Sequence, residues 1–237
     1  MKDCIIKLER LKKNYRMGLV DIQALRGIDL EINEGEFVSI MGPSGCGKST
    51  LLNVLGCLDK PTEGKYYLNK YDISVLDDDT LSDMRCNYLG FVFQSYNLIP
   101  QLSVVENIEI PLYYQGVSPH ESRKKATEIA SRVGLGDRLY HKPTELSGGQ
   151  QQRAGIARAL VNDPLVILAD EPTGNLDSKS GREIMNIFSE LHSLGKTIIM
   201  VTHDEHIARY GERIVRLQDG LIETDESVQL RIREEIS

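Results

Sequence analysis

Hydrophobic positions follow strand-like spacing at both ends of the chain and mostly helical spacing between residues 80 and 162. Short apolar runs between turns predict strands at residues 4–8, 24–32, 37–41, 65–69, 89–93, 165–170, 197–202 and 213–217. Apolar positions three and four residues apart predict helices at residues 48–56, 104–110, 119–133, 148–161 and 179–194. Proline and glycine, Pro111 among them, separate the helices of the middle part.

This alternation of strands and helices predicts an α/β fold with a parallel sheet covered on both faces. The helical stretch interrupts that pattern, so we expect one domain in which residues 94–162 form an inserted helical subdomain. Residues 1–93 and 163–237 then form the α/β core, with its strand-rich beginning as a small antiparallel β subdomain.

Composition narrows the class of protein. The 237 residues suffice for one sizeable core, and a net charge of −7 with a pI near 5.3 argues against a nucleic-acid partner. No apolar run is long enough to span a bilayer, and the first residues lack a signal-peptide core. Residues 226–237 predict a short helix or a frayed end. The cysteines form no CxxC pair and predict reduced thiols in the cytosol: Cys4, Cys46, Cys57 and Cys86.

The stretch GPSGCGKST at residues 42–50 predicts a phosphate-binding loop. It matches G-x-x-x-x-G-K-[ST] and lies between a predicted strand and a predicted helix, the context that this motif requires. Its glycines allow backbone N–H groups to approach phosphates, Lys48 supplies a cation, and the Ser49 hydroxyl suits Mg²⁺. The alternative is an ordinary glycine-rich turn. The expected nucleotide-binding residues are Gly42, Pro43, Ser44, Gly45, Cys46, Gly47, Lys48, Ser49 and Thr50.

Two acids follow a predicted buried strand in LVILADE, residues 165–171. The carboxyl end of a parallel strand is where ligands bind in such sheets. We expect Asp170 to hold Mg²⁺ and Glu171 to orient and polarise a water aimed at the γ-phosphate. Alone, the pair would equally suit a solvated turn before Pro172.

A second anion-binding element is predicted at LSGGQQQR, residues 146–153. Ser147 and the N–H groups of Gly148 and Gly149 begin a predicted helix, and a helix N-terminus attracts anions. This element belongs to the helical insertion, away from the first loop. We therefore expect it to serve the γ-phosphate of another copy, in a two-fold dimer that holds two ATP molecules.

The stretch LSGGQ resembles the signature motif of ABC-type ATPase cassettes. The other motifs of that family are also present and in the same order: Tyr15, GPSGCGKST, Gln94, LADE, NLD at 175–177 and His203. The resemblance covers essentially the whole chain and implies a P-loop NTPase core of RecA-like type. It implies ATP and Mg²⁺ as ligands and ATP hydrolysis as the reaction.

The resemblance also assigns roles to single residues. Tyr15 would stack on adenine, although an edge tyrosine is the alternative. Gln94 would join Mg²⁺ and the attacking water to the helical subdomain, so the expected metal ligands are Ser49, Gln94 and Asp170. His203 would contact the γ-phosphate, and the expected catalytic residues are Lys48, Gln94, Glu171 and His203. Residues expected to act on the partner's nucleotide are Ser147, Gly148, Gly149, Gln150 and Asp177.

Longer segments are similar to the macrolide-export and lipoprotein-release ATPases, the MacB and LolD types. This similarity implies a homodimer formed on ATP binding and membrane permease subunits that dock near Ser95–Gly116, unless that stretch is ordinary subdomain core. Because the 237 residues contain no run that could span a bilayer, we expect those subunits to be separate proteins. It implies a cytoplasmic protein, peripheral on the membrane, that drives export or lipoprotein release. An alternative is a cassette that signals through a permease-like protein without translocating a substrate, as in cell division.

Cys46 departs from the family pattern, which usually has serine at this position. A thiol at the start of a helix is expected to be more reactive than an ordinary cysteine. The sequence therefore predicts that thiol-alkylating reagents react with Cys46 and block ATP hydrolysis, and that bound nucleotide protects it.

Overall fold

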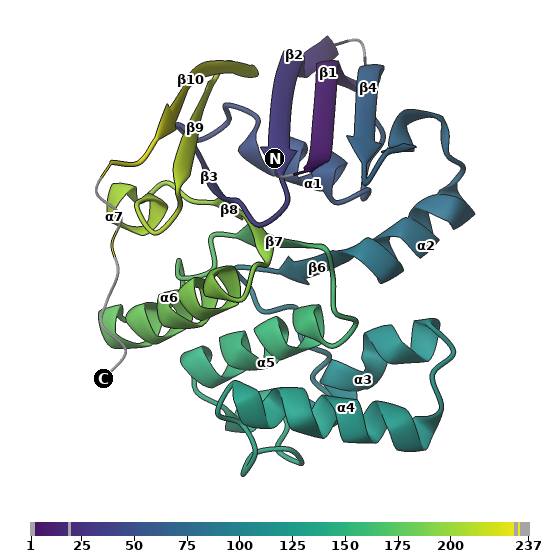
Figure 1. Cartoon of the computed structure of the whole chain (residues 1–237), viewed down its shortest axis with the longest axis vertical. Helices are drawn as coiled ribbons and strands as arrows, with labels where there is room; N and C mark the ends of the chain where they lie inside the picture. The colour runs from purple at the N-terminus through teal and green to yellow at the C-terminus, as the bar shows by residue number, and fades with distance from the viewer. Residues whose placement is uncertain (1–2, 19, 230–231, 233–237) are drawn as a thin grey trace.

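We describe residues 3–18, 20–229 and 232 of a computed structural model. Two sheets and the helices around them form the predicted mixed α/β fold (Figure 1). The helices over residues 104–160 gather at one end, away from the smaller sheet (Figure 1). The expected division into a core and an inserted subdomain at residues 94–162 stays a prediction.

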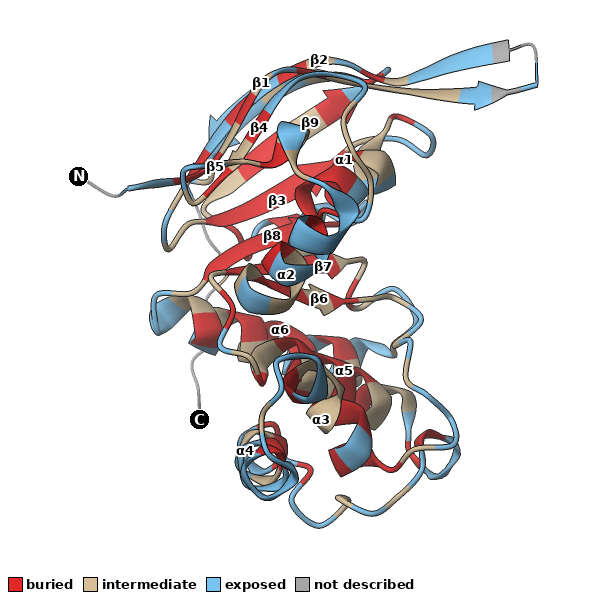
Figure 2. Ribbon diagram, turned by 90° about the vertical axis from the view of Figure 1, so that its right-hand side faces the viewer, coloured by how far each residue is buried: buried red, intermediate tan, exposed pale blue. Residues whose placement is uncertain are grey.

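The larger sheet carries the elements that lead into the predicted site. Its strands are, in spatial order, β10 (Leu221–Ser227), β9 (Arg213–Gln218), β3 (Phe37–Met41), β8 (Thr197–Val201), β7 (Val166–Asp170) and β6 (Leu89–Val92). Neighbouring strands from β9 to β6 run parallel, and β10 pairs with β9 antiparallel. Every residue of β3 and of β8 is buried, as expected for a sheet covered on both faces (Figure 2).

The smaller sheet is antiparallel, as predicted, and its strands are β2 (Val20–Asn33), β1 (Cys4–Met17), β4 (Glu63–Leu68) and β5 (Tyr71–Asp72). Helix α1 (Lys48–Leu55) packs in the core between this sheet and one face of the larger sheet. Successive residues of β8 point to opposite faces, so Ile199 joins this core and Ile198 joins a second one. Both β1 and β2 are longer than the apolar runs that predicted them.

The second core lies between the other face of the larger sheet and four helices. These helices are α3 (Val104–Tyr114), α4 (Pro119–Arg132), α5 (Gly148–Leu160) and α6 (Ser178–Ser193). Shorter helical segments are η1 (Ile73–Val75), η2 (Pro143–Glu145) and α7 (Glu205–Ala208). A single face of α6 is buried, through Ile184, Met185 and Phe188, as its helical spacing of apolar residues predicts.

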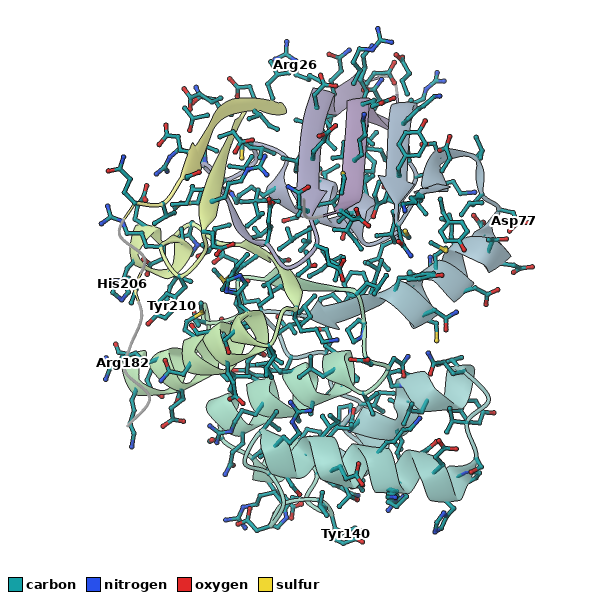
Figure 3. All side chains as sticks on the ribbon, in the orientation of Figure 1. Arg26, Asp77, Tyr140, Arg182, His206 and Tyr210 are labelled. Atoms are coloured by element: carbon teal, nitrogen blue, oxygen red, sulfur yellow. The ribbon has the colours of Figure 1, made fainter. Side chains whose placement is uncertain are left out.

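Helix α2 (Asp78–Tyr88) was not predicted, because only Leu81 and Met84 of its residues are buried. Its apolar face is therefore too narrow to give a clear helical period. The start signal is nevertheless present in the sequence, because Asp77 stands at the beginning of α2 (Figure 3). Its side chain accepts a hydrogen bond from Thr80 N at 2.8 Å, and acids follow in the first turn.

The predicted end of α3 at residue 110 is wrong, since the helix continues through Pro111 to Tyr114. A proline inside a helix loses one backbone hydrogen bond and costs about 3 kcal/mol. Apolar residues on both sides of it, Ile108 and Leu112, are buried, and each buried side chain of this size contributes about 1.5–3 kcal/mol. Burial along the whole helix therefore offsets the proline.

Part of the predicted terminal helix is also wrong: Glu226 and Ser227 belong to strand β10. The rest of that prediction falls largely on residues 230–231 and 233–237, which lie outside the described part of the chain. Among the helices described, none has the length and apolar character needed to cross a membrane.

Candidate nucleotide site

The predicted phosphate loop connects β3 to α1, and its glycines are required by close contacts. Gly42 and Gly47 have positive φ angles of 148° and 107°. A Cβ at Gly42 would lie 2.2 Å from Leu217 O, and one at Gly47 would lie 2.6 Å from Ala24 O. Any side chain would therefore collide with the neighbouring backbone, and the loop keeps its shape only with glycine at these positions.

The start of α1 is open to an anion. Gly47 is its N-cap and offers no side-chain hydrogen bond, and no acidic residue occupies the first turn. The first N–H groups of a helix have no partner within it, so an uncapped start favours a negatively charged ligand. Pro43, Ser44 and Gly45 are exposed beside it.

Lys48 folds back over this loop. Its Nζ donates to Gly42 O at 2.7 Å and to Pro43 O at 2.9 Å. The cation is therefore already above the loop, held by neutral carbonyl groups that a phosphate oxygen can replace with a stronger, charge-assisted bond.

Asp170 and Glu171 leave the carboxyl end of β7, as predicted. Burial raises the pKa of Asp170, the charge of Glu171 raises it further, and the Lys48 ammonium lowers it. Two adjacent carboxylates near one lysine thus favour an additional cation. Mg²⁺ usually takes one or two carboxylates and completes its shell with phosphate oxygens and water. The predicted ligands would suit it, because they are all oxygen donors: the Ser49 hydroxyl, the Asp170 carboxylate and the Gln94 amide oxygen.

His203 follows β8, the strand next to β7, and therefore reaches the same edge of the sheet. Its Nδ1 lies 2.7 Å from Oε1 of Glu171, so the ring can donate a hydrogen bond to that carboxylate. The side chain of His203 is 72% exposed, whereas that of Glu171 is 16% exposed. The structure thus brings these two predicted residues together, with the histidine facing solvent.

Gln94, after β6, contacts the loop that follows Glu171. Its Nε2 donates to Asn175 Oδ1 at 3.5 Å, and Asn175 Nδ2 donates to Gln94 O at 3.0 Å. A Cβ at Gly174 would lie 2.7 Å from Gln94 Nε2. Asn175 belongs to the NLD motif, but the sequence assigns it no role, and only the fold shows that it joins the two loops.

The predicted second cradle begins α5. Ser147 Oγ accepts from Gln150 N at 3.3 Å, and Gln150 Oε1 accepts from Ser147 N at 2.9 Å, a reciprocal cap. A Cβ at Gly148 would lie 2.8 Å from the Tyr96 hydroxyl. One at Gly149 would lie 3.1 Å from the Ser180 side chain, so this helix start is packed against elements other than residues 42–47.

Asp177 and Tyr15 have partners of their own. Asp177 caps α6, with Oδ1 accepting from the backbone N of Lys179 and Ser180, each at 3.0 Å. Hydrogen bonds from Ser180 lower the pKa of the Asp177 carboxyl. Tyr15 donates its hydroxyl to Asp59 at 2.8 Å, and Lys13 Nζ lies 4.9 Å from the centre of the ring. Burial raises the pKa of Tyr15, and Asp59 raises it further.

The expectation of an accessible Cys46 is wrong. The residue is 3% exposed, and its thiol lies under Gly42, where a Cβ would approach Sγ to 2.6 Å. The backbone of Cys46 is tied to both sides, because its N–H donates to Pro43 O and its C=O accepts from Gly220 N at 3.0 Å. Its position at a helix start suggested reactivity, but the side chain points into the protein.

Known proteins are similar to this chain over most of its length. Residues 25–174 match the family model described as ABC transporter. An ABC transporter ATP-binding protein of Thermotoga maritima is 53% identical over 92% of this chain and 94% of its own length. The macrolide export ATP-binding/permease protein MacB of Vibrio parahaemolyticus is 51% identical over 95% of this chain, which spans 34% of that longer protein.

The solved structures include a similar cassette, MJ0796 of Methanocaldococcus jannaschii. Its dimeric post-hydrolysis structure bound to ADP and Pi has a TM-score of 0.88 at 51% identity, over 95% of this chain and 100% of that one. A second dimeric structure of MJ0796 gives the same TM-score at 52% identity. The fold is therefore that of a P-loop NTPase core, and the chain belongs to the ABC transporter family, as an ATP-binding cassette with ATPase activity.

Proposed function

We propose that the chain is the ATP-binding subunit of a transporter and that two copies hold ATP between them, head to tail. This proposal rests on one observation: the chain has two helix starts that suit phosphate, those of α1 and α5. The two starts pack against different parts of the chain. One nucleotide on residues 42–50 leaves the start of α5 unused within the same chain. A second copy related by a two-fold axis uses it, and the dimers formed by MJ0796 support this arrangement.

Each residue of the first site has a role in this proposal. Residues 42–50 bind the phosphates, and Lys48 exchanges its carbonyl partners for the β- and γ-phosphate oxygens. Glu171 accepts a hydrogen bond from the attacking water, and His203 holds the Glu171 carboxylate in place until it contacts the γ-phosphate. When bound through Ser49, Gln94 and Asp170, Mg²⁺ neutralises charge on the phosphates.

The second site is contributed by the partner copy. Its Ser147, Gly148, Gly149 and Gln150 would bind the γ-phosphate, with Asp177 at the neighbouring loop. Because Asp177 caps its own helix in this structure, its contribution across the dimer requires exchange of at least one of those hydrogen bonds. Tyr15 would stack on adenine through the ring face opposite Lys13.

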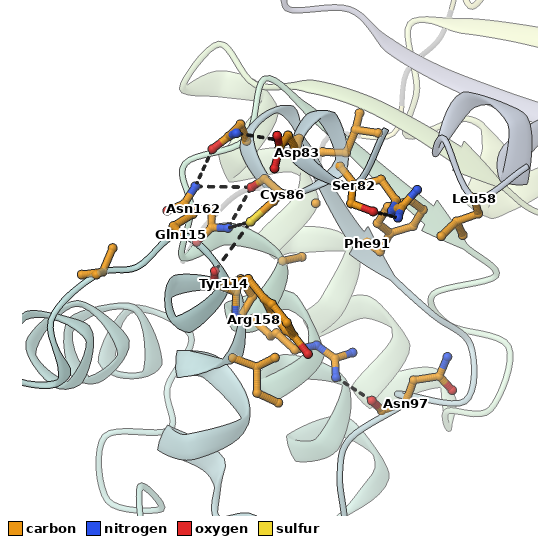
Figure 4. Close-up of a pocket in the computed structure, with 18 of the residues that line it drawn as sticks. Leu58, Ser82, Asp83, Cys86, Phe91, Asn97, Tyr114, Gln115, Arg158 and Asn162 are labelled. Atoms are coloured by element: carbon orange, nitrogen blue, oxygen red, sulfur yellow. Dashed lines mark hydrogen bonds between the residues drawn. The ribbon is translucent and has the colours of Figure 1, made fainter. Parts of the chain in front are cut away.

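A groove beside residues 95–116 supports docking of a permease. It has a volume of about 1050 Å³ and lies between α2, β6, α3 and α5 (Figure 4). Leu58, Phe91 and Tyr114 give it apolar walls, while Asp83 and Asn162 lie at its polar side. Leu58 and Tyr114 are large apolar residues left exposed on the surface, as is common where a partner binds.

The segment that borders the groove is held in shape from both sides. Arg158 of α5 donates to Asn97 O at 2.5 Å and to Tyr96 O at 3.0 Å, although both residues have positive φ angles. Buried Asn107 accepts from Ile99 N at 2.7 Å and donates to nearby carbonyl groups. A rigid segment that continues from Gln94 can pass movement from the nucleotide to a permease helix lying in the groove.

The finer function follows the similarity to macrolide-export proteins. We propose that separate membrane subunits carry the substrate in export or lipoprotein release, with this chain peripheral on the cytoplasmic face. The competing hypothesis, signalling without translocation, uses the same ATP site and the same docking groove, and it differs only in what the membrane partner does.

Glu171→Gln tests the catalytic assignment. The amide keeps the size of the side chain but cannot act as a base, so we expect ATP binding and an ATP-dependent dimer with turnover reduced at least about 10²-fold. Size-exclusion chromatography with ATP measures the dimer, and phosphate release measures turnover. Turnover at the wild-type rate would remove Glu171 as the catalyst.

Mixing Lys48→Ala with Gly149→Asp tests the shared site. Each variant alone damages both sites of its dimer, whereas a mixed dimer keeps one complete site, so a one-to-one mixture should recover up to about a quarter of wild-type activity. The matched control mixes Lys48→Ala with the double variant Lys48→Ala/Gly149→Asp, which leaves no complete site. Equal activity in the two mixtures, with mixed dimers demonstrated, contradicts the head-to-tail arrangement.

Alkylation of the native thiols tests the docking groove. Cys86 lies in the groove and is partly exposed, whereas exposed Cys4 belongs to β1 and serves as the internal control (Figure 4). In the assembled complex with its permease, we expect N-ethylmaleimide to modify Cys86 at least about fivefold more slowly than in the free chain, because a docked helix excludes the reagent. Unchanged labelling of Cys86, measured by mass spectrometry, would place the permease elsewhere.

A further inference from the structure

Gln152 is a buried polar residue that the proposed reaction leaves unexplained. It lies in the second turn of α5, is 0% exposed, and donates its Nε2 to Pro172 O at 2.8 Å. Pro172 follows Glu171 directly, so this hydrogen bond joins the helix of the second cradle to the backbone that carries the proposed base. The other polar atom of the side chain, Oε1, is buried and has no hydrogen-bond partner among the described residues.

The backbone of Glu171 needs such support. Its φ angle is 45°, a left-handed conformation that non-glycine residues adopt only when their surroundings enforce it. Its N–H donates to Val201 O at 2.9 Å, and its C=O accepts from Gly174 N at 3.0 Å to close a turn. The next carbonyl of that turn, Pro172 O, accepts from Gln152 Nε2. Val201 and Gly174 contact the turn through their backbone, whereas Gln152 does so through its side chain.

The buried Oε1 of Gln152 affects how the side chain is held. Leaving Oε1 without a donor is unfavourable in a medium of low dielectric constant, and Nε2 alone holds the amide, so a movement of α5 acts directly on its bond to Pro172 O. The single bond to Pro172 would carry such a movement to the Glu171 turn.

We propose that Gln152 is a positioning residue for hydrolysis, which makes the orientation of Glu171 depend on the position of α5. This inference rests on the proposed function, because α5 is the helix whose start binds the partner's nucleotide. A γ-phosphate held at Ser147–Gly149 of one copy then acts, through Gln152, on the base that serves the other nucleotide, and the two sites of the dimer are coupled in this way.

Gln152→Met tests the proposal, since methionine has a similar length and no N–H group. We expect kcat to fall at least about tenfold, because small misplacement of a reacting group can cost on the order of 10²-fold, while KM for ATP changes less than about twofold. The ATP-dependent dimer should persist when Gln152→Met is combined with Glu171→Gln. A residue needed only for folding would lower the melting temperature without separating kcat from KM in this way.

Gln151→Met is the matched control. The neighbouring glutamine is partly buried on the same helix and donates to Leu146 O at 3.2 Å, away from the Glu171 turn, so its kcat should stay within about twofold of wild type. A Gln152→Met enzyme with the wild-type kcat, or with the whole loss in KM, overturns the proposal. If Glu171→Gln is inactive and Gln152→Met is normal, the proposed function stands and this inference alone fails.

A measurement on the wild-type chain covers the case in which Gln152→Met does not fold. In protein labelled with ¹⁵N-glutamine, the side-chain amide protons of Gln152 should exchange with solvent far more slowly than those of exposed Gln23. They should also change their chemical shift when ATP joins two Glu171→Gln copies. Exchange as fast as that of Gln23, or a shift unaffected by the dimer, contradicts the proposal.

Discussion

Parallel pairing of adjacent strands is the constraint from which the site follows. Strands β3, β8, β7 and β6 are neighbours in that order and run in the same direction, so the segments after them leave the sheet at one edge. Residues separated by more than a hundred positions in the sequence therefore meet there. Lys48, Gln94, Glu171 and His203 each depend on this arrangement more than on any contact between their own side chains.

The charged groups at that edge of the sheet have separate partners within the chain. Lys48 is held by uncharged carbonyl groups, whereas Glu171 is paired with His203 and not with the lysine. The ammonium and the helix start thus remain available to an anion, and the two carboxylates remain available to a cation. Separating the groups in this way avoids a strong internal ion pair that a nucleotide would have to break.

How much of this can be predicted from the sequence depends on whether the signal is local. The strand, glycine loop and helix at residues 37–56 are adjacent in the chain, and the acids at 170–171 end a strongly apolar run, so both were predicted correctly in position. Helix α2 was missed because few of its residues are buried, and the continuation of α3 through Pro111 depends on burial that only the folded protein shows. The contact between Gln152 and Pro172 joins positions 20 residues apart and leaves no pattern in the sequence.

The orientation of Cys46 bears on how such a site withstands oxidants. A peroxide or a disulfide reagent must reach a sulfur atom to attack it, and this one is covered by the loop that binds phosphate. Cysteine in place of the usual serine at position 46 therefore adds an apolar, buried side chain that oxidants do not reach. Among the four cysteines, Cys4 is exposed and Cys86 partly exposed, so an oxidant would reach these two before the buried thiol of the nucleotide loop.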